Sequence, residues 1–121
     1  MRIFKNTWFF RFARKEKISD EELRGIVRQL ESGHAEANLG GGVFKVRLAR
    51  SGEGKAGGYR VIVFFKSEFR TFFVYGFAKS DRGNIEQGEL QLFKDDARDQ
   101  LSLTDEQLEN WLKNRTLIEI L

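Results

Sequence analysis

The sequence contains no cysteine, no proline and a single histidine, His34, among its 121 residues. The absence of cysteine excludes disulfide bonds, iron–sulfur clusters and thiol catalysis. One histidine without cysteine also excludes the usual zinc sites, so a metal site would have to be built from carboxylates alone. We therefore expect neither a metal nor a cofactor, and we expect His34 to have no functional role.

Long hydrophobic runs are also missing. No apolar stretch approaches the roughly 20 residues needed to cross a bilayer, and residues 1–5 lack the apolar core of a signal peptide. Of the 121 residues 40% are apolar, which is enough for one compact domain and too few for two of ordinary size. We therefore expect one domain over residues 1–121, located in the cytoplasm and not bound to a membrane.

The sequence does have a marked separation of charge. Its net charge is only +3, but residues 43–82 hold nine Lys and Arg against three Asp and Glu, whereas residues 84–110 hold two against eight. A local cationic surface favours a polyanion, and phosphate is the usual target. The middle of the chain is therefore the candidate nucleic-acid-binding region.

This cationic region has the periodicity of β-strands. Apolar residues recur at every second position in residues 44–48 and again in residues 60–64, the pattern of a strand with one packed face and one free face. The turn Lys66–Phe69 is short and polar, which predicts an antiparallel hairpin around it. Three strands are expected, over residues 43–49, 59–66 and 70–78.

Helix signals flank these strands. Ser19 to Glu22 have the pattern of a capping box, which predicts a helix over about residues 19–32 that ends before Gly33. We expect Asn84 to cap a second helix that reaches about residue 101, and Thr104 to cap a short third helix. The remaining elements are a strand near residues 2–6 and, over residues 117–121, either a final strand or a docked tail.

The order β-α-β-β-β-α-α predicts an α+β fold. We expect a mostly antiparallel sheet of about four strands, with the N-terminal helix and the C-terminal helices packed on it. The aromatic group Trp8, Phe9, Phe10 and Phe12 is expected in the core. The pairs Phe64–Phe65 and Phe72–Phe73 put one ring on each face of the sheet, so we expect helices to cover one face and a partner to meet the other.

Three fragments follow one another on the expected strands: Phe44–Leu48 with the pattern K-x-R, Gly54–Ile62 with G-K-x-G-G-Y-R, and Tyr75–Arg82 with Y-x-x-x-K-x-x-R. In this order they resemble the RelE/HigB toxins of bacterial type II toxin–antitoxin systems, and the glycine-rich loop is most similar to the HigB-like branch. The resemblance covers about residues 19–101. Residues 102–121 form a C-terminal extension that either stabilises the fold or contributes to a partner surface.

The resemblance implies an endoribonuclease, an mRNA interferase, that cleaves messenger RNA on the translating ribosome. Such a toxin inhibits translation, arrests growth and is neutralised by a cognate antitoxin, for which a helix-turn-helix protein is one candidate. The implied partners are thus the antitoxin, the ribosome and mRNA. Two alternatives stay open: a non-catalytic nucleic-acid-binding module, and an adaptor that docks an acidic protein.

Cleavage of RNA by its own 2′-hydroxyl requires a base, stabilisation of charge at phosphorus and an acid for the leaving 5′-oxygen. A paired-histidine ribonuclease is excluded, because His34 is the only histidine. Crowded cations lower the pKa of a lysine, so Lys45 and Lys55 are candidates for proton transfer. The resemblance implies that Arg60 faces the scissile phosphate, where its planar guanidinium suits bidentate binding.

Lys79 completes the candidate catalytic set. Tyr59 and Tyr75 could stack on an RNA base, although aromatic residues in strands more often pack in the core. The charged residues of the strands could likewise be only solvated, because an antiparallel sheet often keeps one polar face. One departure is that some family members have a tyrosine just inside the last helix as a proton-transfer group, whereas the nearest position here is Glu86. The proton-transfer residue is therefore left open. The expected RNA-binding residues are Arg47, Arg50, Arg82, Tyr59 and Tyr75.

Overall fold

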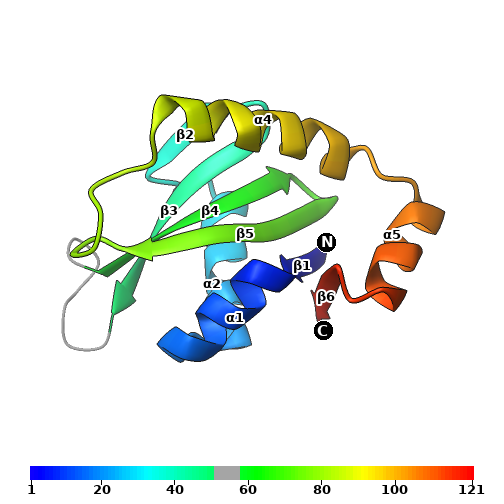
Figure 1. Ribbon diagram of the computed structural model, residues 1–121, viewed down its shortest axis with the longest axis horizontal. Helices are drawn as coiled ribbons and strands as arrows, with labels where there is room; N and C mark the ends of the chain where they lie inside the picture. The colour runs from blue at the N-terminus through cyan, green and yellow to red at the C-terminus, as the bar shows by residue number, and fades with distance from the viewer. Residues whose placement is uncertain (51–57) are drawn as a thin grey trace.

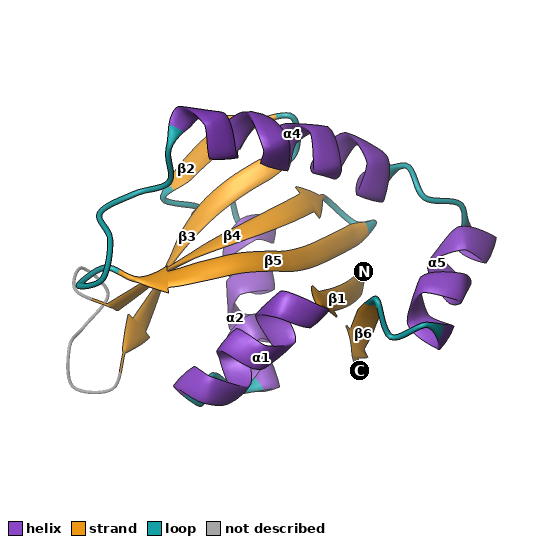
Figure 2. Ribbon diagram, in the orientation of Figure 1, coloured by secondary structure: helices purple, strands orange, loops and turns teal. Residues whose placement is uncertain are grey.

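The chain folds around one sheet, with two helices before the four strands in the middle of the chain and two after them (Figures 1 and 2). The computed structural model describes residues 1–50 and 58–121, so the expected site residue Lys55 lies outside the described residues. None of the helices in these two ranges is long and apolar enough to cross a membrane. The elements are β1 (Arg2–Asn6), α1 (Thr7–Glu16), α2 (Asp20–Glu31), β2 (Ala37–Gly40), β3 (Val43–Arg50), β4 (Gly58–Lys66), β5 (Arg70–Ala78), α4 (Gln87–Leu101), α5 (Asp105–Lys113) and β6 (Leu117–Ile120).

The strand order in the sheet is β2-β3-β4-β5-β1-β6. β1 runs parallel to β5, and every other neighbouring pair is antiparallel. The α+β class and the β4–β5 hairpin are therefore confirmed. The expected count of about four strands is wrong, because the described residues form six: residues 37–40 add β2, and the C-terminal segment forms β6 rather than a tail.

The capping signals in the sequence work as expected at two helices. Ser19 Oγ accepts the amide of Glu22 at 3.1 Å, and Glu22 Oε1 accepts the amide of Ser19 at 3.0 Å. Thr104 caps α5 in the same way. Gly33 follows α2 with a φ of +78°, the left-handed conformation that favours glycine after a helix.

The expected cap of α4 is wrong. The N-cap is Glu86 and the helix begins at Gln87, because the side chain of Asn84 is engaged elsewhere. Asn84 Oδ1 accepts the amide of Ile85 at 2.9 Å and Nζ of Lys45 at 3.2 Å. The residues before α4 therefore form a loop that bends towards β3.

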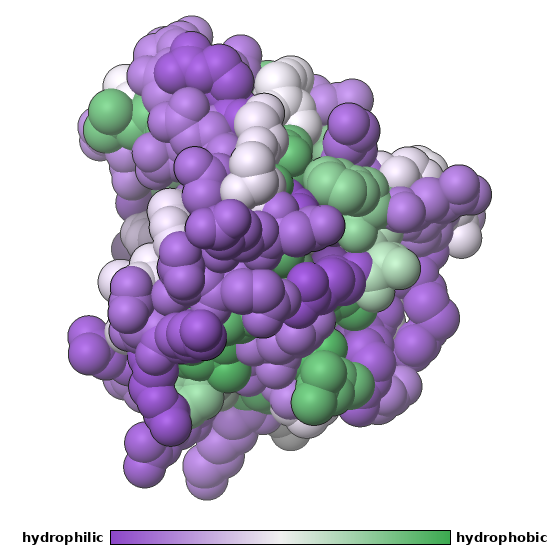
Figure 3. Space-filling view, turned by 90° about the vertical axis from the view of Figure 1, so that its right-hand side faces the viewer, coloured by the Kyte–Doolittle hydropathy of each residue, from purple (hydrophilic) through white to green (hydrophobic). Residues whose placement is uncertain are grey.

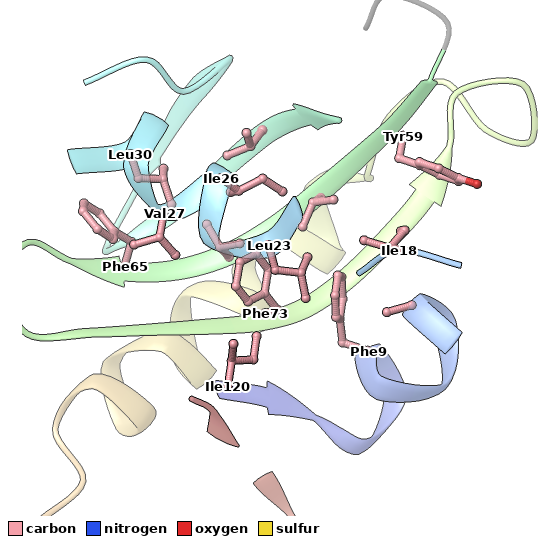
Figure 4. Packing of buried hydrophobic residues seen from close by; sticks show 14 of the residues in the cluster. Phe9, Ile18, Leu23, Ile26, Val27, Leu30, Tyr59, Phe65, Phe73 and Ile120 are labelled. Atoms are coloured by element: carbon pink, nitrogen blue, oxygen red, sulfur yellow. The ribbon is translucent and has the colours of Figure 1, made fainter. Parts of the chain in front are cut away.

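Two hydrophobic clusters form, one on each face of the sheet. The first lies between the sheet and helices α1 and α2, and includes Phe65 and Phe73 (Figure 4). The second lies between the sheet and helices α4 and α5, and includes Phe64 and Phe72. All four rings are buried. The expectation that one face is left free of helices is therefore wrong, since helices cover these rings on both faces.

The C-terminal extension is part of this core. Leu108 of α5 and Leu117 of β6 are buried in the second cluster, and Ile120 is buried in the first. Buried Arg70 of β5 pairs with Asp105 at 3.0 Å. The side of the molecule that carries α5 is mainly hydrophilic, with apolar residues in separate patches (Figure 3). Of the two roles left open for this extension, the structure shows the stabilising one.

Helix α1 is not expected from the sequence, where its aromatic residues indicate only a core cluster. The helix begins because Asn6 caps it: the side-chain oxygen accepts the amide of Phe9 at 2.7 Å. Phe9 is fully buried, but Trp8 is 44% exposed. The expectation of a core position is therefore wrong for Trp8, which helical geometry places at the edge of the packed stripe.

A close approach holds α1 against β5. A Cβ atom at Gly76 would lie 2.5 Å from Cε2 of Phe12. Gly76→Ala is therefore expected to lower the free energy of unfolding by about 1–3 kcal/mol, measured by urea denaturation, because the ring must leave its packed position. Gly88→Ala is the matched control, since nothing lies within 4 Å of the added carbon in α4. Equal losses in the two variants would contradict this account of α1 packing.

Candidate active site

Neighbouring strands place two arginines side by side on one face of the sheet. Arg47 on β3 lies directly opposite Arg60 on β4, and Arg60 lies opposite Phe77 on β5. Residues directly opposite each other point to the same face. By alternation this is the face of Ile62 and Phe64, which belong to the cluster under α4. Arg47 and Arg60 lie beyond that cluster, at the end of the sheet where β5 leads into the loop before α4.

A carboxylate that the sequence reasoning missed holds these cations together. Glu36 Oε1 accepts Nε of Arg47 at 2.6 Å and Nε of Arg60 at 3.2 Å. Nζ of Lys45 lies 3.5 Å from Glu36 Oε2. The Glu36 side chain is only 16% exposed. One partly buried carboxylate thus pairs with three cations, so the group keeps a net positive charge. We call Glu36, Lys45, Arg47 and Arg60 the cation cluster.

Glu36 is ionised at neutral pH. Burial raises its pKa, but the hydrogen bond from Arg47 and the charges of Lys45, Arg60 and Arg47 outweigh burial and hold that pKa below its usual range. Stability from a carboxyl group with a depressed pKa is fully present above its unfolded-state pKa and is lost as the pH falls through the folded-state pKa. Lowering the pH should therefore reduce the contribution of the cation cluster to the free energy of unfolding.

Glu36→Gln tests this linkage. At about pH 7 the variant is expected to unfold with a free energy about 1–3 kcal/mol below the wild type, because buried cations lose a charged acceptor. Below the ordinary glutamate pKa of 4.5 the difference should shrink as the wild-type carboxylate is protonated. Urea denaturation of both proteins over this pH range measures it. A difference that stays constant would show that the charge of Glu36 does not stabilise the cluster.

Lys45 lies where the cluster meets the loop before α4. Its Nζ donates to Asn84 Oδ1 at 3.2 Å and also faces Glu36. The Lys45 side chain is mostly buried. The amine is therefore held by an amide and a carboxylate, and it lies on the same face as the two arginines.

Arg82 extends the cationic surface across β5. Its guanidinium lies over the ring of Phe77 at 5.4 Å and donates to the Tyr75 hydroxyl at 3.0 Å. Phe77 of β5 is the direct neighbour of Arg60 on β4. The Arg82 guanidinium therefore lies over the strand next to the cation cluster. The hydrogen bond from Arg82 to Glu89 of α4 raises the pKa of Arg82. Arg82 is therefore permanently charged and anchored to α4.

Two expected RNA-binding residues lie on the opposite face. Tyr59 is buried against α1, and its hydroxyl donates to Glu16 Oε1 at 2.8 Å. In Figure 4 this hydroxyl lies at the outer end of the side chain, at the edge of the cluster. Arg50 lies over the same ring at 5.5 Å. The structure thus gives Tyr59 packing contacts and places both side chains on the face opposite to that of Arg60.

Of the remaining expected residues, Lys79 and Glu86 make their side-chain and capping hydrogen bonds away from the cation cluster. Lys79 lies in the turn after β5, where its Nζ donates to the carbonyl of Gly83. Glu86 is exposed at the N-cap of α4, and its amide donates to Glu89 at 2.8 Å. Lys55 falls in residues 51–57, outside the described residues.

The signal that could have revealed Glu36 is the triple glycine. Gly40 to Gly42 all have positive φ and connect β2 to β3, with Ala37 opposite Lys45. A hairpin centred on these glycines places residues 36–39 alongside the strand that carries the K-x-R pattern, and so puts Glu36 next to its cations.

The arrangement suits a phosphodiester. Guanidinium groups bind phosphate oxygens through paired hydrogen bonds, and preorganised donors stabilise charge that develops on those oxygens. Among residues 1–50 and 58–121, no three His, Asp or Glu side chains are grouped so as to hold a metal ion. The described residues offer charge stabilisation and a lysine amine.

Comparison with known families assigns the chain to one of them. Residues 1–120 match the family described as the RelE toxin of the RelE/RelB toxin–antitoxin system. The chain belongs to the RelE toxin family. The RelE match extends over α1, α5 and β6, and so reaches well beyond the residues on which the sequence resemblance rests. RelE membership makes the protein the toxin of a toxin–antitoxin system and implies an antitoxin as its partner.

Proposed function

We propose that this RelE-family protein is an endoribonuclease that cleaves mRNA on the translating ribosome and inhibits translation until its antitoxin neutralises it. The cation cluster is the observation that supports this proposal most strongly. Arg47 and Arg60 lie in register on one face, fixed by Glu36. A phosphodiester placed there meets two oriented guanidinium groups.

In the proposed reaction the 2′-oxygen attacks the adjacent phosphorus. The new bond joins the 2′-oxygen to phosphorus, and the bond from phosphorus to the 5′-oxygen breaks. The products are a 2′,3′-cyclic phosphate and a 5′-hydroxyl. One proton leaves the 2′-hydroxyl, and one is delivered to the departing 5′-oxygen.

Arg60 and Arg47 stabilise the negative charge that builds up on the phosphate oxygens. Lys45 is the first candidate for proton transfer, because its amine faces the same side as both arginines. Lys55, Lys79 and Glu86 are further candidates for the second proton transfer. Arg82 and Tyr75 extend the RNA-binding surface across β5.

The burial of Arg60 supports the proposed dependence on the ribosome. Arg60 is 4% exposed, so only a strand held in one orientation reaches its guanidinium edge. The ribosome presents mRNA in a fixed, unpaired conformation, which supplies the alignment that a free strand lacks. The cluster therefore needs to contribute mainly electrostatic stabilisation.

A defined message tests this proposal. The purified protein is incubated with a short mRNA, either alone or in a stalled ribosome complex, and 5′-hydroxyl ends are mapped. Cleavage within the decoded codon in the ribosome complex, and little in free RNA, is expected. Absence of cleavage in both settings, with binding retained, would favour a non-catalytic RNA-binding module. For such a module, each lost phosphate contact lowers the salt slope by about 0.7.

We further propose that the protein belongs to the HigB-like branch and acts in the cytoplasm. The support is the motif G-K-x-G-G-Y-R over Gly54–Arg60. A helix-turn-helix protein encoded next to the toxin would then be its antitoxin. Coexpression of that protein should restore growth, and failure to restore growth would oppose this branch assignment.

A further inference from the structure

Helix α1 and the edge of β5 form an aromatic groove that the sequence did not predict. Trp8 is 44% exposed, although its ring lies 4.6 Å from that of Tyr75 and 5.3 Å from that of Phe12. A hollow of about 260 Å³ between α1 and β5 is lined by these three rings and by Arg82. A second hollow, of about 350 Å³, continues over Trp8 to Arg11 and Lys15.

The charges around this α1 groove are mainly positive. Arg11, Arg14 and Lys15 are exposed along the helix. Of the two carboxylates that line the first hollow, Glu16 accepts the hydroxyl of Tyr59, and Asp81 lies in the turn after β5. The groove therefore combines exposed ring surface with cations, the combination used by surfaces that bind single-stranded nucleic acid.

The groove is continuous with the cation cluster. The rings of Tyr75 and Phe77 lie 6.0 Å apart, and Phe77 is the direct neighbour of Arg60. Arg82 lies over both rings. A line of neighbouring side chains thus leads from Arg60 through Phe77 and Tyr75 to Trp8, with ring centroids 6.0 Å apart at the Phe77–Tyr75 step and 4.6 Å apart at the Tyr75–Trp8 step. A single strand of RNA bound at Arg60 can follow this line around the edge of β5.

We propose that the α1 groove is a stacking subsite for a nucleotide that flanks the cleaved phosphodiester in the same RNA strand. The base stacks on Trp8, and Arg11 and Lys15 bind adjacent phosphates. This inference rests on the proposed function for the identity of the RNA as mRNA. A flat base fits the exposed part of the Trp8 side chain, whereas an acidic peptide would use the cations but not the line of rings.

The first experiment uses Trp8 as its own reporter. The chain has two tryptophans, so full-length Trp111→Phe leaves Trp8 as the single emitter. The probe is a nine-nucleotide 2′-O-methyl RNA, which lacks the attacking hydroxyl and is not cleaved. Its binding is followed by anisotropy and by Trp8 fluorescence. Saturable quenching of Trp8 is expected, and RNA binding without quenching, or no binding at low salt, overturns the subsite.

Variants separate stacking from general charge. Trp8→Leu is expected to weaken binding of the probe about tenfold. Arg11→Gln with Lys15→Gln should lower the salt slope by about 1.4, at about 0.7 for each phosphate contact in a single strand. The double variant Arg98→Gln with Lys113→Gln removes the same charge from exposed positions of α4 and α5 and is the matched control. Equal effects of the two double variants overturn the subsite.

Two further outcomes are distinguishable. Oligoglutamate that quenches Trp8 and displaces the RNA at equal concentration would assign the groove to an acidic protein segment and overturn the RNA subsite. Quenching by RNA in a protein that cleaves no message would leave the subsite standing and refute the proposed function. Cleavage on the ribosome without quenching of Trp8 would refute the subsite and leave the proposed function standing.

Discussion

The Arg60→Ala variant is expected to cleave message on the ribosome about 10²–10³-fold more slowly than the wild type, which corresponds to about 2.7–4 kcal/mol of transition-state stabilisation. The reason is that Arg60 is the buried one of the two arginines and is held by Glu36 in one orientation. Single-turnover cleavage of a defined message in a stalled ribosome complex measures the rate.

Two controls accompany this variant. Arg98→Ala removes an exposed arginine of α4 and should leave the cleavage rate unchanged. Arg60→Lys keeps the charge but loses the planar fork, and an intermediate rate is expected. Urea denaturation shows whether each variant is folded under assay conditions. An Arg60→Ala protein that is folded and cleaves at the wild-type rate would remove Arg60 from the mechanism.

Leu108→Ala is expected to lower the free energy of unfolding by about 2–5 kcal/mol, a large part of the stability of a domain of this size. Leu108 of α5 is fully buried in the cluster under α4 and α5. Removing its side chain leaves a cavity that the sheet and both helices cannot close. Urea or thermal denaturation followed by circular dichroism measures the change.

Leu92→Ala makes the same chemical change at a position of α4 that is 65% exposed. It should alter the free energy of unfolding by less than about 0.5 kcal/mol. Similar values for the two leucine variants would mean that α5 is not part of the cooperative core, contrary to the packing of residues 102–121.

The sequence predicts the elements whose signals are local. The capping box at Ser19 and the polar turn before Arg70 depend only on neighbouring residues, and both α2 and the β4–β5 hairpin are found where expected. Helix α1 is missed because its start depends on Asn6, and its aromatic residues alone do not distinguish a helix from a core strand.

The arginine row is predictable in part. Alternation puts Lys45 and Arg47 on one face of β3, but it does not say which residue of β4 lies opposite. The register of β3 against β4 pairs Arg47 with Arg60 and places Tyr59 on the other face. Glu36 comes to the site from the position before β2 and Trp8 from α1, through contacts between distant parts of the chain. Periodicity within one segment contains no information about such contacts.

The most direct test of the central claim is to map mRNA 5′ ends in translating cells that express either the wild type or Arg60→Ala from a tightly repressed promoter. The account predicts growth arrest with new, codon-phased 5′ ends in the wild type, and neither in the variant. Wild-type cells without new ends, or identical ends in both strains, would contradict a ribosome-dependent ribonuclease centred on Arg60.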